Sequence, residues 1–226
     1  MLVSDLQTSV AYKVGDTAAP APGTDDYNQR LSFANEGNRQ WSERWYWTVL
    51  KRYSNTITTV AGQNWIQLPT DFDPLTLTAK VFITDSNGNN VPYKVVPIED
   101  VTRYATTSNI CYTQYDITTF LWRLYFQPIP TISGLIVKFY YKSNAPILAS
   151  NLDMIIVDNP DWLVYYVTIQ VLLAQQSAEQ NAIAIQYQGT AEQMMQQMIA
   201  NDSLSNLNSI STVRTSTDEL GGGYGI

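Results

Sequence analysis

Apolar residues recur every three to four positions in the first part of the chain, which is the spacing of one helix face. The helices that this spacing predicts cover residues 4–14, 24–36 and 39–53. Thr24 supplies a hydroxyl cap for the second helix, because a side-chain oxygen at that position can accept a free backbone N–H. Gly37 separates the second predicted helix from the third.

From Thr56 the pattern changes to short β-branched and aromatic runs that are broken by turn residues. The seven predicted strands are Thr56–Val60, Asn64–Leu68, Leu77–Thr84, Asn90–Val96, Tyr112–Thr118, Leu121–Phe126 and Ile132–Tyr141. Asn87 and Gly88 predict a tight hairpin turn over residues 85–89. Seven short strands at this spacing are typical of a small antiparallel barrel or sandwich.

A long helix is predicted after the strands. Asp158 or Asn159 can cap it, with Pro160 in its first turn. The helix should run from Trp162 to about Tyr187. Its first half is apolar nearly all round and should be buried on most sides. The pair Gly189-Thr190 predicts a break, after which the chain can continue as helix.

These elements predict an α+β fold. Residues 1–55 and 150–200 should form one discontinuous helical domain, an antiparallel bundle in which 24–53 pack against 159–187. Residues 56–149 should form an inserted antiparallel β domain. Residues 201–226 are rich in Ser, Asn, Thr and Gly. Such a segment is expected to be an extended tail, which is either solvated or ordered on a partner.

Four tryptophans mark the helical segments as packing or interface positions: Trp41, Trp45, Trp47 and Trp162. On a continuous helix Trp41 and Trp45 share a face, and Trp47 points to the opposite side. One side could then pack inside the protomer while the other meets a partner. The alternative is that the tryptophans anchor a single core.

Charge excludes one class of function. The net charge is −7, and no Lys or Arg occurs between Lys142 and Arg214. Proteins that grip nucleic acid need a basic face, so tight phosphate binding is not expected. Charged residues make up only 15% of the chain, and amides and hydroxyls supply the remaining polarity. Such a surface suits extensive protein–protein contact, although an ordinary polar surface would give the same composition.

Candidate chemistry is sparse. The chain has no histidine and one cysteine, so it can build neither a Ser-His-Asp triad nor a cysteine-based zinc site. Cys111 lies in a strand-like stretch and is expected to be a buried apolar side chain rather than a reactive thiol. Asp71 and Asp73 could be a carboxylate pair or calcium ligands, but Asp beside Pro is more often part of a turn. We expect no catalytic residue, cofactor or metal.

The N-terminus shows no signal-peptide pattern, and the apolar stretch 162–174 is too short to span a bilayer. The glycines at 221–225 have no helix after them, so they do not resemble a phosphate-binding loop. We therefore expect no signal peptide and no membrane partner, and the single cysteine is consistent with a cytosolic product.

Several motifs occur in a fixed order. The β region opens with Ala61-Gly62-Gln63-Asn64-Trp65-Ile66-Gln67-Leu68-Pro69-Thr70-Asp71-Phe72, after an aromatic-rich helix. Its middle holds Tyr115-Asp116-Ile117-Thr118 and Leu124-Tyr125-Phe126-Gln127-Pro128-Ile129-Pro130. It closes with Gly134-Leu135-Ile136-Val137-Lys138-Phe139-Tyr140-Tyr141, and a long helix then begins at Asp161-Trp162. In order and spacing, over about residues 24–200, the chain resembles the head-to-tail adaptor (connector) proteins of tailed bacteriophages.

That resemblance implies a structural protein of the virion neck, made in the host bacterial cytoplasm. Such adaptors form a homo-oligomeric ring, generally of twelve subunits, between the portal protein and the tail or nozzle protein. The ring extends the channel through which double-stranded DNA is ejected, without binding it specifically. The resemblance also implies that the C-terminal tail contacts the portal, with Arg214, Tyr224 and Ile226 as candidate anchors. The turn Asp85, Ser86, Asn87, Gly88 and Asn89 is a candidate tail- or nozzle-binding loop, with Ala105–Asn109 nearby.

Two alternatives from other classes remain open at this stage. One is a cell-wall-degrading glycosidase that uses a pair of carboxylates, although no particular pair is favoured. The other is a carbohydrate- or receptor-binding β module of a phage particle, with Trp65, Trp122 and Tyr112 as candidate sugar-stacking residues.

Overall fold

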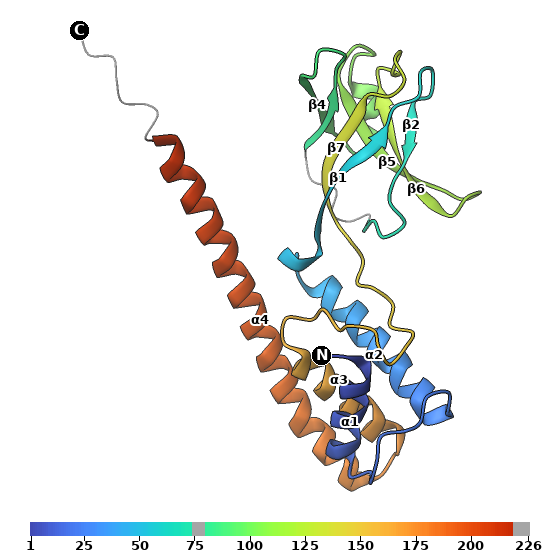
Figure 1. The fold of residues 1–226 in the computed structure, drawn as a ribbon, viewed down its shortest axis with the longest axis vertical. Helices are drawn as coiled ribbons and strands as arrows, with labels where there is room; N and C mark the ends of the chain where they lie inside the picture. Colours follow the sequence, from blue (N-terminus) through green and yellow to red (C-terminus); the bar gives the residue numbers. More distant parts are fainter. Residues whose placement is uncertain (74–79, 219–226) are drawn as a thin grey trace. The chain divides into compact units, whose positions relative to one another are not determined.

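The computed structural model describes residues 1–73 and 80–218, and it is a mixed α+β protein with two compact units (Figure 1). One unit is helical and joins Met1–Val49 to Ala145–Ile226. The other unit, Leu50–Asn144, contains all seven described strands. The β segment is therefore inserted between two helical segments.

The helical unit contains α1 (Val3–Val14), α2 (Asp25–Arg44), α3 (Pro160–Ala174) and α4 (Ala178–Asp218). The helix α3 contacts each of the other three. It is almost free of charged residues, and eight of its residues are buried, as its uniform apolar pattern predicted. Local capping agrees with the sequence: the Tyr27 N–H donates to Thr24 Oγ1 at 3.3 Å, and the Asp161 N–H donates to Asn159 Oδ1 at 3.2 Å.

The predicted break at Gly37 is wrong, because α2 runs without interruption from Asp25 to Arg44. Gly37 is needed for close packing and does not break the helix. A Cβ atom at this position would lie 2.6 Å from Tyr166 Cδ1 and 2.7 Å from Leu163 Cδ1 of α3. The predicted helix over 39–53 is also corrected. It ends at Arg44, and a short 3-10 turn, η1 (Thr48–Leu50), leads into the first strand.

The predicted helix from Trp162 to Tyr187 is two helices. The chain turns at Gln175–Ser177, where Gln176 adopts a left-handed conformation with φ of 57°. Ser177 caps α4, because its Oγ accepts the Gln180 N–H at 3.1 Å. Gly189 lies inside α4 and does not break it. The helix then continues to Asp218, so residues 201–218 are helical where an extended tail was predicted. Ser, Asn and Thr have only modest helix propensity, so these residues extend a helix that is already nucleated by packing against α3.

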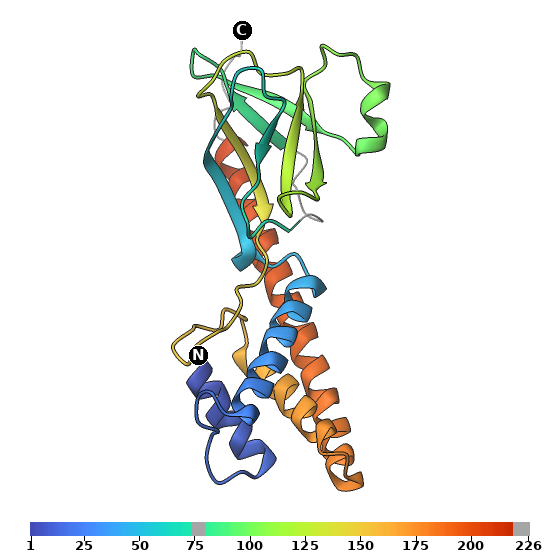
Figure 2. The ribbon, with the colours of Figure 1, turned by 90° about the vertical axis from the view of Figure 1, so that its right-hand side faces the viewer.

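The second unit is one curled sheet of seven strands (Figure 2). The strands are β1 (Lys51–Thr58), β2 (Trp65–Gln67), β3 (Lys80–Thr84), β4 (Asn90–Val95), β5 (Ile110–Asp116), β6 (Leu121–Gln127) and β7 (Ile136–Lys142). All seven predicted strands are present, with shifted ends, although residues 77–79 of the third lie outside the described residues. A short 3-10 helix that the sequence did not predict, η3 (Ile98–Arg103), connects β4 to β5.

The strand order is β1-β7-β3-β4-β5-β6-β2. The sheet curls into a half-barrel, and no pairing between β1 and β2 closes it. The small antiparallel barrel or sandwich predicted from the strand spacing is therefore an open, curled sheet. The pairing is antiparallel except between β4 and β5, which run parallel. This parallel step needs the crossover that contains η3, since two parallel strands cannot be joined by a tight turn. The concave core includes Leu68, Val81, Leu124 and Phe139.

Candidate interaction surfaces

The four predicted tryptophans have unequal roles. Trp41 and Trp47 are both fully buried and stack with ring centroids 4.9 Å apart. The Trp47 Nε1–H also donates to the Trp41 carbonyl at 2.6 Å. Trp162 is buried as well, whereas Trp45 is 37% exposed. The predicted split between Trp41 and Trp47 fails because α2 ends before Trp47 and the chain folds back.

Trp45 is held by a residue that sequence reasoning did not single out. Its Nε1–H donates to Asp202 Oδ2 at 2.9 Å, and the Thr48 N–H donates to Asp202 Oδ1 at 3.0 Å. One carboxylate of α4 thus fixes the turn that ends α2. Asp202 in turn raises the pKa of Asp158, whose charged form is disfavoured first by burial and then by the nearby carboxylate.

An ordered connection before α3 exposes three large apolar side chains. Ile147 is 83% exposed, Leu152 is 81% exposed and Met154 is 67% exposed. This connection, residues 145–158, is nevertheless well anchored. Asn35 exchanges two hydrogen bonds with the Leu148 backbone, at 2.7 and 2.8 Å. Apolar side chains presented by a fixed backbone are typical of a protein–protein contact surface. No sequence periodicity marks them, since they lie in an irregular segment.

The carboxylate of Asp153 shapes the same connection. It accepts the Ala149 N–H at 2.6 Å and the Ser150 N–H at 2.8 Å. These hydrogen bonds, together with one from the Ser150 hydroxyl, lower the pKa of Asp153. The connection also pairs with the start of α1 through a β-bridge between Leu2 and Met154. The shape of this surface is therefore built in before any partner binds.

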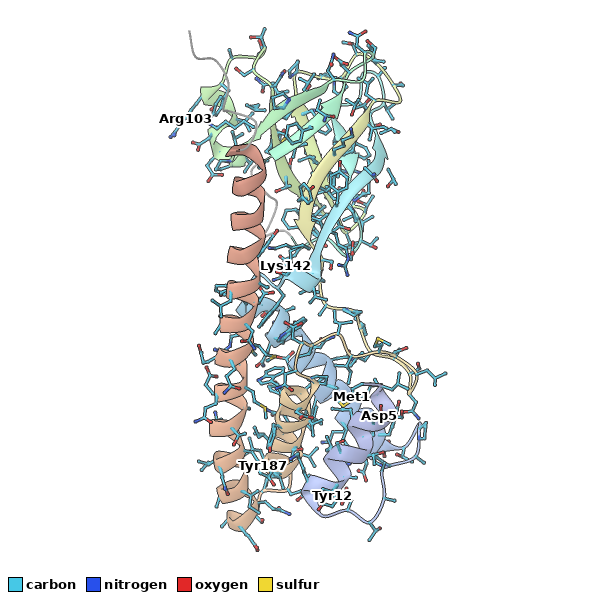
Figure 3. The ribbon with its side chains drawn as sticks, turned by 60° about the vertical axis from the view of Figure 1, so that its left-hand side comes forward. Met1, Asp5, Tyr12, Arg103, Lys142 and Tyr187 are labelled. Carbon is cyan, nitrogen blue, oxygen red and sulfur yellow. The ribbon has the colours of Figure 1, made fainter. Side chains whose placement is uncertain are left out.

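A groove of about 460 Å³ lies between three helices of the same unit. Its lining comes from α1, α3 and α4: Thr8, Ser9, Tyr12, Lys13, Asp161, Val164, Tyr165 and Met194. Tyr12 on α1 and Tyr187 on α4 lie towards the same end of the helical unit (Figure 3). The Lys13 ammonium lies 4.0 Å from the Tyr165 ring centroid and 5.5 Å from that of Tyr187. Tyr12 is 87% exposed, so an aromatic side chain is available at the rim.

The turn over residues 85–89 forms as predicted. The Asp85 N–H donates to the Asn89 carbonyl at 2.8 Å, and Gly88 has a φ of 85°. The Asp85 carboxylate accepts the N–H groups of Asn87 and Asn89, and the bond from the Asn89 backbone is the main cause of its lowered pKa. All five residues of the turn carry polar or no side chains and are solvent-accessible. It is therefore a rigid polar tip without an apolar anchor.

The predicted portal-binding residues fall at the end of the chain. Arg214 lies in the last turns of α4, where only the backbone is described. Tyr224 and Ile226 lie outside the described residues, so their part in portal binding stays a prediction.

The candidate carboxylates of the β unit have partners within it. Asp73 forms a largely buried ion pair with Lys142, with Oδ2 and Nζ 3.2 Å apart. Asp71 Oδ1 accepts the Tyr141 hydroxyl at 3.1 Å. Burial, then the charge of Asp71 and this hydrogen bond, raise the pKa of Tyr141 to about 12. These contacts tie the loop after β2 to the end of β7, near the Lys142 label in Figure 3. The arrangement holds the fold together and does not present carboxylates to a substrate.

Cys111 is fully buried, as expected, and burial raises its pKa to about 12. Among residues 1–73 and 80–218, no three His, Cys, Asp or Glu side chains are placed to share a metal ion. Within the same ranges, no helix has the length and hydropathy needed to cross a membrane.

The three aromatic residues considered for sugar stacking contact other side chains. The Arg123 guanidinium lies 3.8 Å from the Trp65 ring centroid. Trp122 packs against Tyr115, with centroids 5.4 Å apart. Tyr112 stacks on Tyr125, with centroids 5.1 Å apart. The flat faces that a sugar ring would need are thus partly taken by neighbours in the sheet.

We compared the sequence of the whole chain with known proteins and protein families. A search of curated proteins gives no significant match. The family model described as SU10 adaptor protein matches residues 1–216. This match spans both helical segments and the inserted sheet, so it covers the full helix–sheet–helix order that the motifs predicted. The chain therefore belongs to the SU10 adaptor protein family, and the predicted kinship with phage head-to-tail adaptors is confirmed.

Proposed function

We propose that this chain forms a ring, of twelve copies, that joins the portal to the tail or nozzle of a tailed phage and extends the DNA channel. The family match over residues 1–216 carries the proposal, because it gives the chain a structural adaptor role in a phage particle. The number twelve and the two partners come from the resemblance to phage connectors. The particle's neck would then be its site of action.

Ring formation has support in the helical unit. The connection 145–158 presents Ile147, Leu152 and Met154 to solvent on a fixed backbone, and the rim of the helical groove presents Tyr12. Exposing several large apolar side chains is unfavourable for an isolated protein, so contact with other copies would stabilise it. In this proposal α1 to α4 act as an antiparallel bundle that brings these surfaces into the subunit interfaces.

DNA passage has support in the charge distribution. No Lys or Arg lies between Lys142 and Arg214, an interval that contains α3 and most of α4. A channel wall that drew on this interval would repel phosphates or hold them weakly, and DNA could slide past it.

The two attachment sites follow from the same scheme. We assign portal contact to the C-terminal end of α4 and the residues beyond it, including Arg214, Tyr224 and Ile226. We assign tail or nozzle contact to the β unit, with the rigid polar turn Asp85–Asn89 among its contact loops. The role is structural and not catalytic. The carboxylates Asp73 and Asp202 serve as partners for buried or backbone groups of the chain itself.

Cryo-electron microscopy of the assembled particle tests the proposal directly. The expected result is a ring of twelve copies between portal and tail, into which both units fit. A reconstruction that placed the chain in the capsid shell or in a fibre, or a ring of another subunit number, would contradict it.

A truncation tests the portal assignment separately. Deleting residues 206–226 removes the end of α4 but keeps Asp202, Ser203 and Ser205, whose contacts lie within the helical unit. The truncated chain should fold with the same thermal midpoint and should bind DNA-filled heads much more weakly. Undiminished head binding would remove this segment from the portal contact.

A further inference from the structure

The hairpin that joins β5 to β6 ends in an apolar tip. The last strand pair is Asp116 with Leu121, so four residues form the tip: Ile117, Thr118, Thr119 and Phe120. Ile117 is 78% exposed and Phe120 is 73% exposed. The two central threonines carry no charge. Two large apolar side chains thus stand in water at the end of a hairpin.

The backbone of Phe120 adds a second unfavourable feature. Its φ is 55°, in the left-handed region. Bulky residues rarely adopt this conformation, because the Cβ atom crowds the following carbonyl. Glycine or asparagine would take the position more easily. Residues held in such conformations gather at functional sites, where another gain offsets the strain. Since Phe120 buries little of its surface within the chain, that gain must come from a partner.

The tip is held in shape by its base. The Asp116 carboxylate accepts the Thr118 N–H at 3.1 Å and also accepts the Thr119 hydroxyl. Arg123 pairs with the same carboxylate at 2.6 Å, and both side chains are mostly buried. The Arg123 guanidinium in turn lies 3.8 Å from the Trp65 ring centroid. A tip fixed in this way loses little conformational freedom on binding, which favours docking.

Charge narrows the choice of partner. The four tip residues are uncharged, and the two charged residues that flank them in the hairpin, Asp116 and Arg123, form an ion pair. The chain as a whole has a net charge of −7. Segments that insert into anionic bilayers have Lys or Arg next to their apolar residues, whereas the four tip residues include neither. An apolar cleft in another protein, with an uncharged rim, fits the tip better.

We propose that the β5–β6 tip is the anchor by which each copy docks into an apolar cleft of the tail-side partner protein, with Phe120 and Ile117 as the inserted side chains. This inference rests on the proposed function, which assigns portal contact to α4 and leaves the β unit for the tail side. Two side chains give a weak individual contact. A ring presents many identical tips, and their combined avidity makes the attachment stable.

The test uses particles that lack their own adaptor and are supplied with full-length chains. The variant is Ile117→Ser with Phe120→Asn, and the control is Ile129→Ser with Ile132→Ser, which alters two half-exposed isoleucines on another loop of the β unit. Two quantities are measured: the fraction of DNA-filled heads that carry the adaptor, and the fraction that carry a complete tail. The thermal midpoint of each purified chain is measured alongside.

The tip variant should occupy heads normally and should lower tail attachment at least tenfold, while the control should match wild type in both. Its thermal midpoint should equal or exceed that of wild type, because asparagine relieves the strain at position 120. Normal tail attachment by the variant would overturn the inference. So would a folded variant that fails to occupy heads, since the tip would then serve the ring or the portal.

A vesicle assay distinguishes a lipid surface from a protein as the partner of the tip. Wild-type protein should not sediment with vesicles of phosphatidylcholine and phosphatidylglycerol, and sedimentation that depends on Phe120 would overturn the choice of a protein partner. Failure of the proposed function has a different signature, because wild-type chain would then occupy no heads at all.

Discussion

Replacing Gly37 by alanine tests whether close packing of α2 on α3 is the reason for glycine at this position. The added Cβ atom would lie 2.6 Å from Tyr166 Cδ1 and 2.7 Å from Leu163 Cδ1. Ordinary contacts between carbon atoms are about 3.5–4.0 Å. Since the new atom overlaps both neighbours by about 1 Å relative to that range, the two helices must separate or the side chains must leave their rotamers.

Two effects of opposite sign decide the result. Overpacking of a well-packed site costs about 1–3 kcal/mol. Alanine favours the helix over glycine by about 1 kcal/mol. We therefore expect Gly37→Ala to lower the free energy of unfolding by up to about 2 kcal/mol after this offset.

Gly189→Ala is the matched control. Gly189 lies within α4, and a Cβ atom there would meet nothing within 4 Å. The control should raise the free energy of unfolding by about 0.5–1 kcal/mol through helix propensity alone. Because the propensity gain is common to both variants, the difference between them isolates the overpacking cost of about 1–3 kcal/mol.

Urea unfolding followed by tryptophan fluorescence measures both variants, since Trp41 and Trp47 are buried in the helical unit. If Gly37→Ala proved as stable as Gly189→Ala, the close approach of α2 and α3 would be refuted.

Three further predictions concern buried polar groups. Asp202→Ala should lower the free energy of unfolding by about 1–3 kcal/mol, because the Trp45 Nε1–H and the Thr48 backbone N–H lose their acceptor. Near-ultraviolet circular dichroism should report the altered environment of the Trp45 indole. An unchanged spectrum together with unchanged stability would contradict this role for Asp202. Asp73→Ala should lower the free energy of unfolding by about 3–5 kcal/mol, because it leaves the buried Lys142 ammonium without this carboxylate. Adding Lys142→Met should recover most of that loss, as measured by thermal denaturation. A double variant no more stable than the single variant would argue against a buried ion pair. Burial raises the pKa of Cys111 to about 12, so the thiol stays protonated in the folded protein. Its contribution to stability is complete below the unfolded pKa of about 8.5 and is lost as the pH rises towards 12. Rapid reaction of the native thiol with a disulfide reagent at pH 8 would contradict the burial of Cys111.

Features that depend on near neighbours in the chain could be read from the sequence. The caps at Thr24 and Asn159, the Asp85–Asn89 turn and the existence of seven strands all follow from local chemistry. A capping oxygen or a glycine with positive φ acts within a few residues, so its effect does not need the rest of the fold. The order of helical, β and helical segments also carried the family resemblance, which the match over residues 1–216 confirms.

Features that depend on distant neighbours could not be read in this way. Gly37 predicts a break by its propensity, yet it lies inside α2, where α3 approaches so closely that an added Cβ atom would clash with Tyr166 and Leu163. The parallel pairing of β4 with β5 and the open edge of the sheet depend on which strands meet after the chain curls. Local sequence sets the strands but not their partners.

The candidate surfaces divide along the same line. The sequence identified the tryptophans as packing residues and the 85–89 turn as a polar tip. Only the tertiary structure showed that Ile147, Leu152 and Ile117 remain exposed, because the exposure of a side chain depends on whether distant segments of the chain pack over it. Likewise, the pairing of Asp202 with Trp45 joins residues 157 positions apart. The sequence alone indicated the strands, the helix caps and the family resemblance, and the packing of distant segments decided where the helices end and which side chains are left for partners.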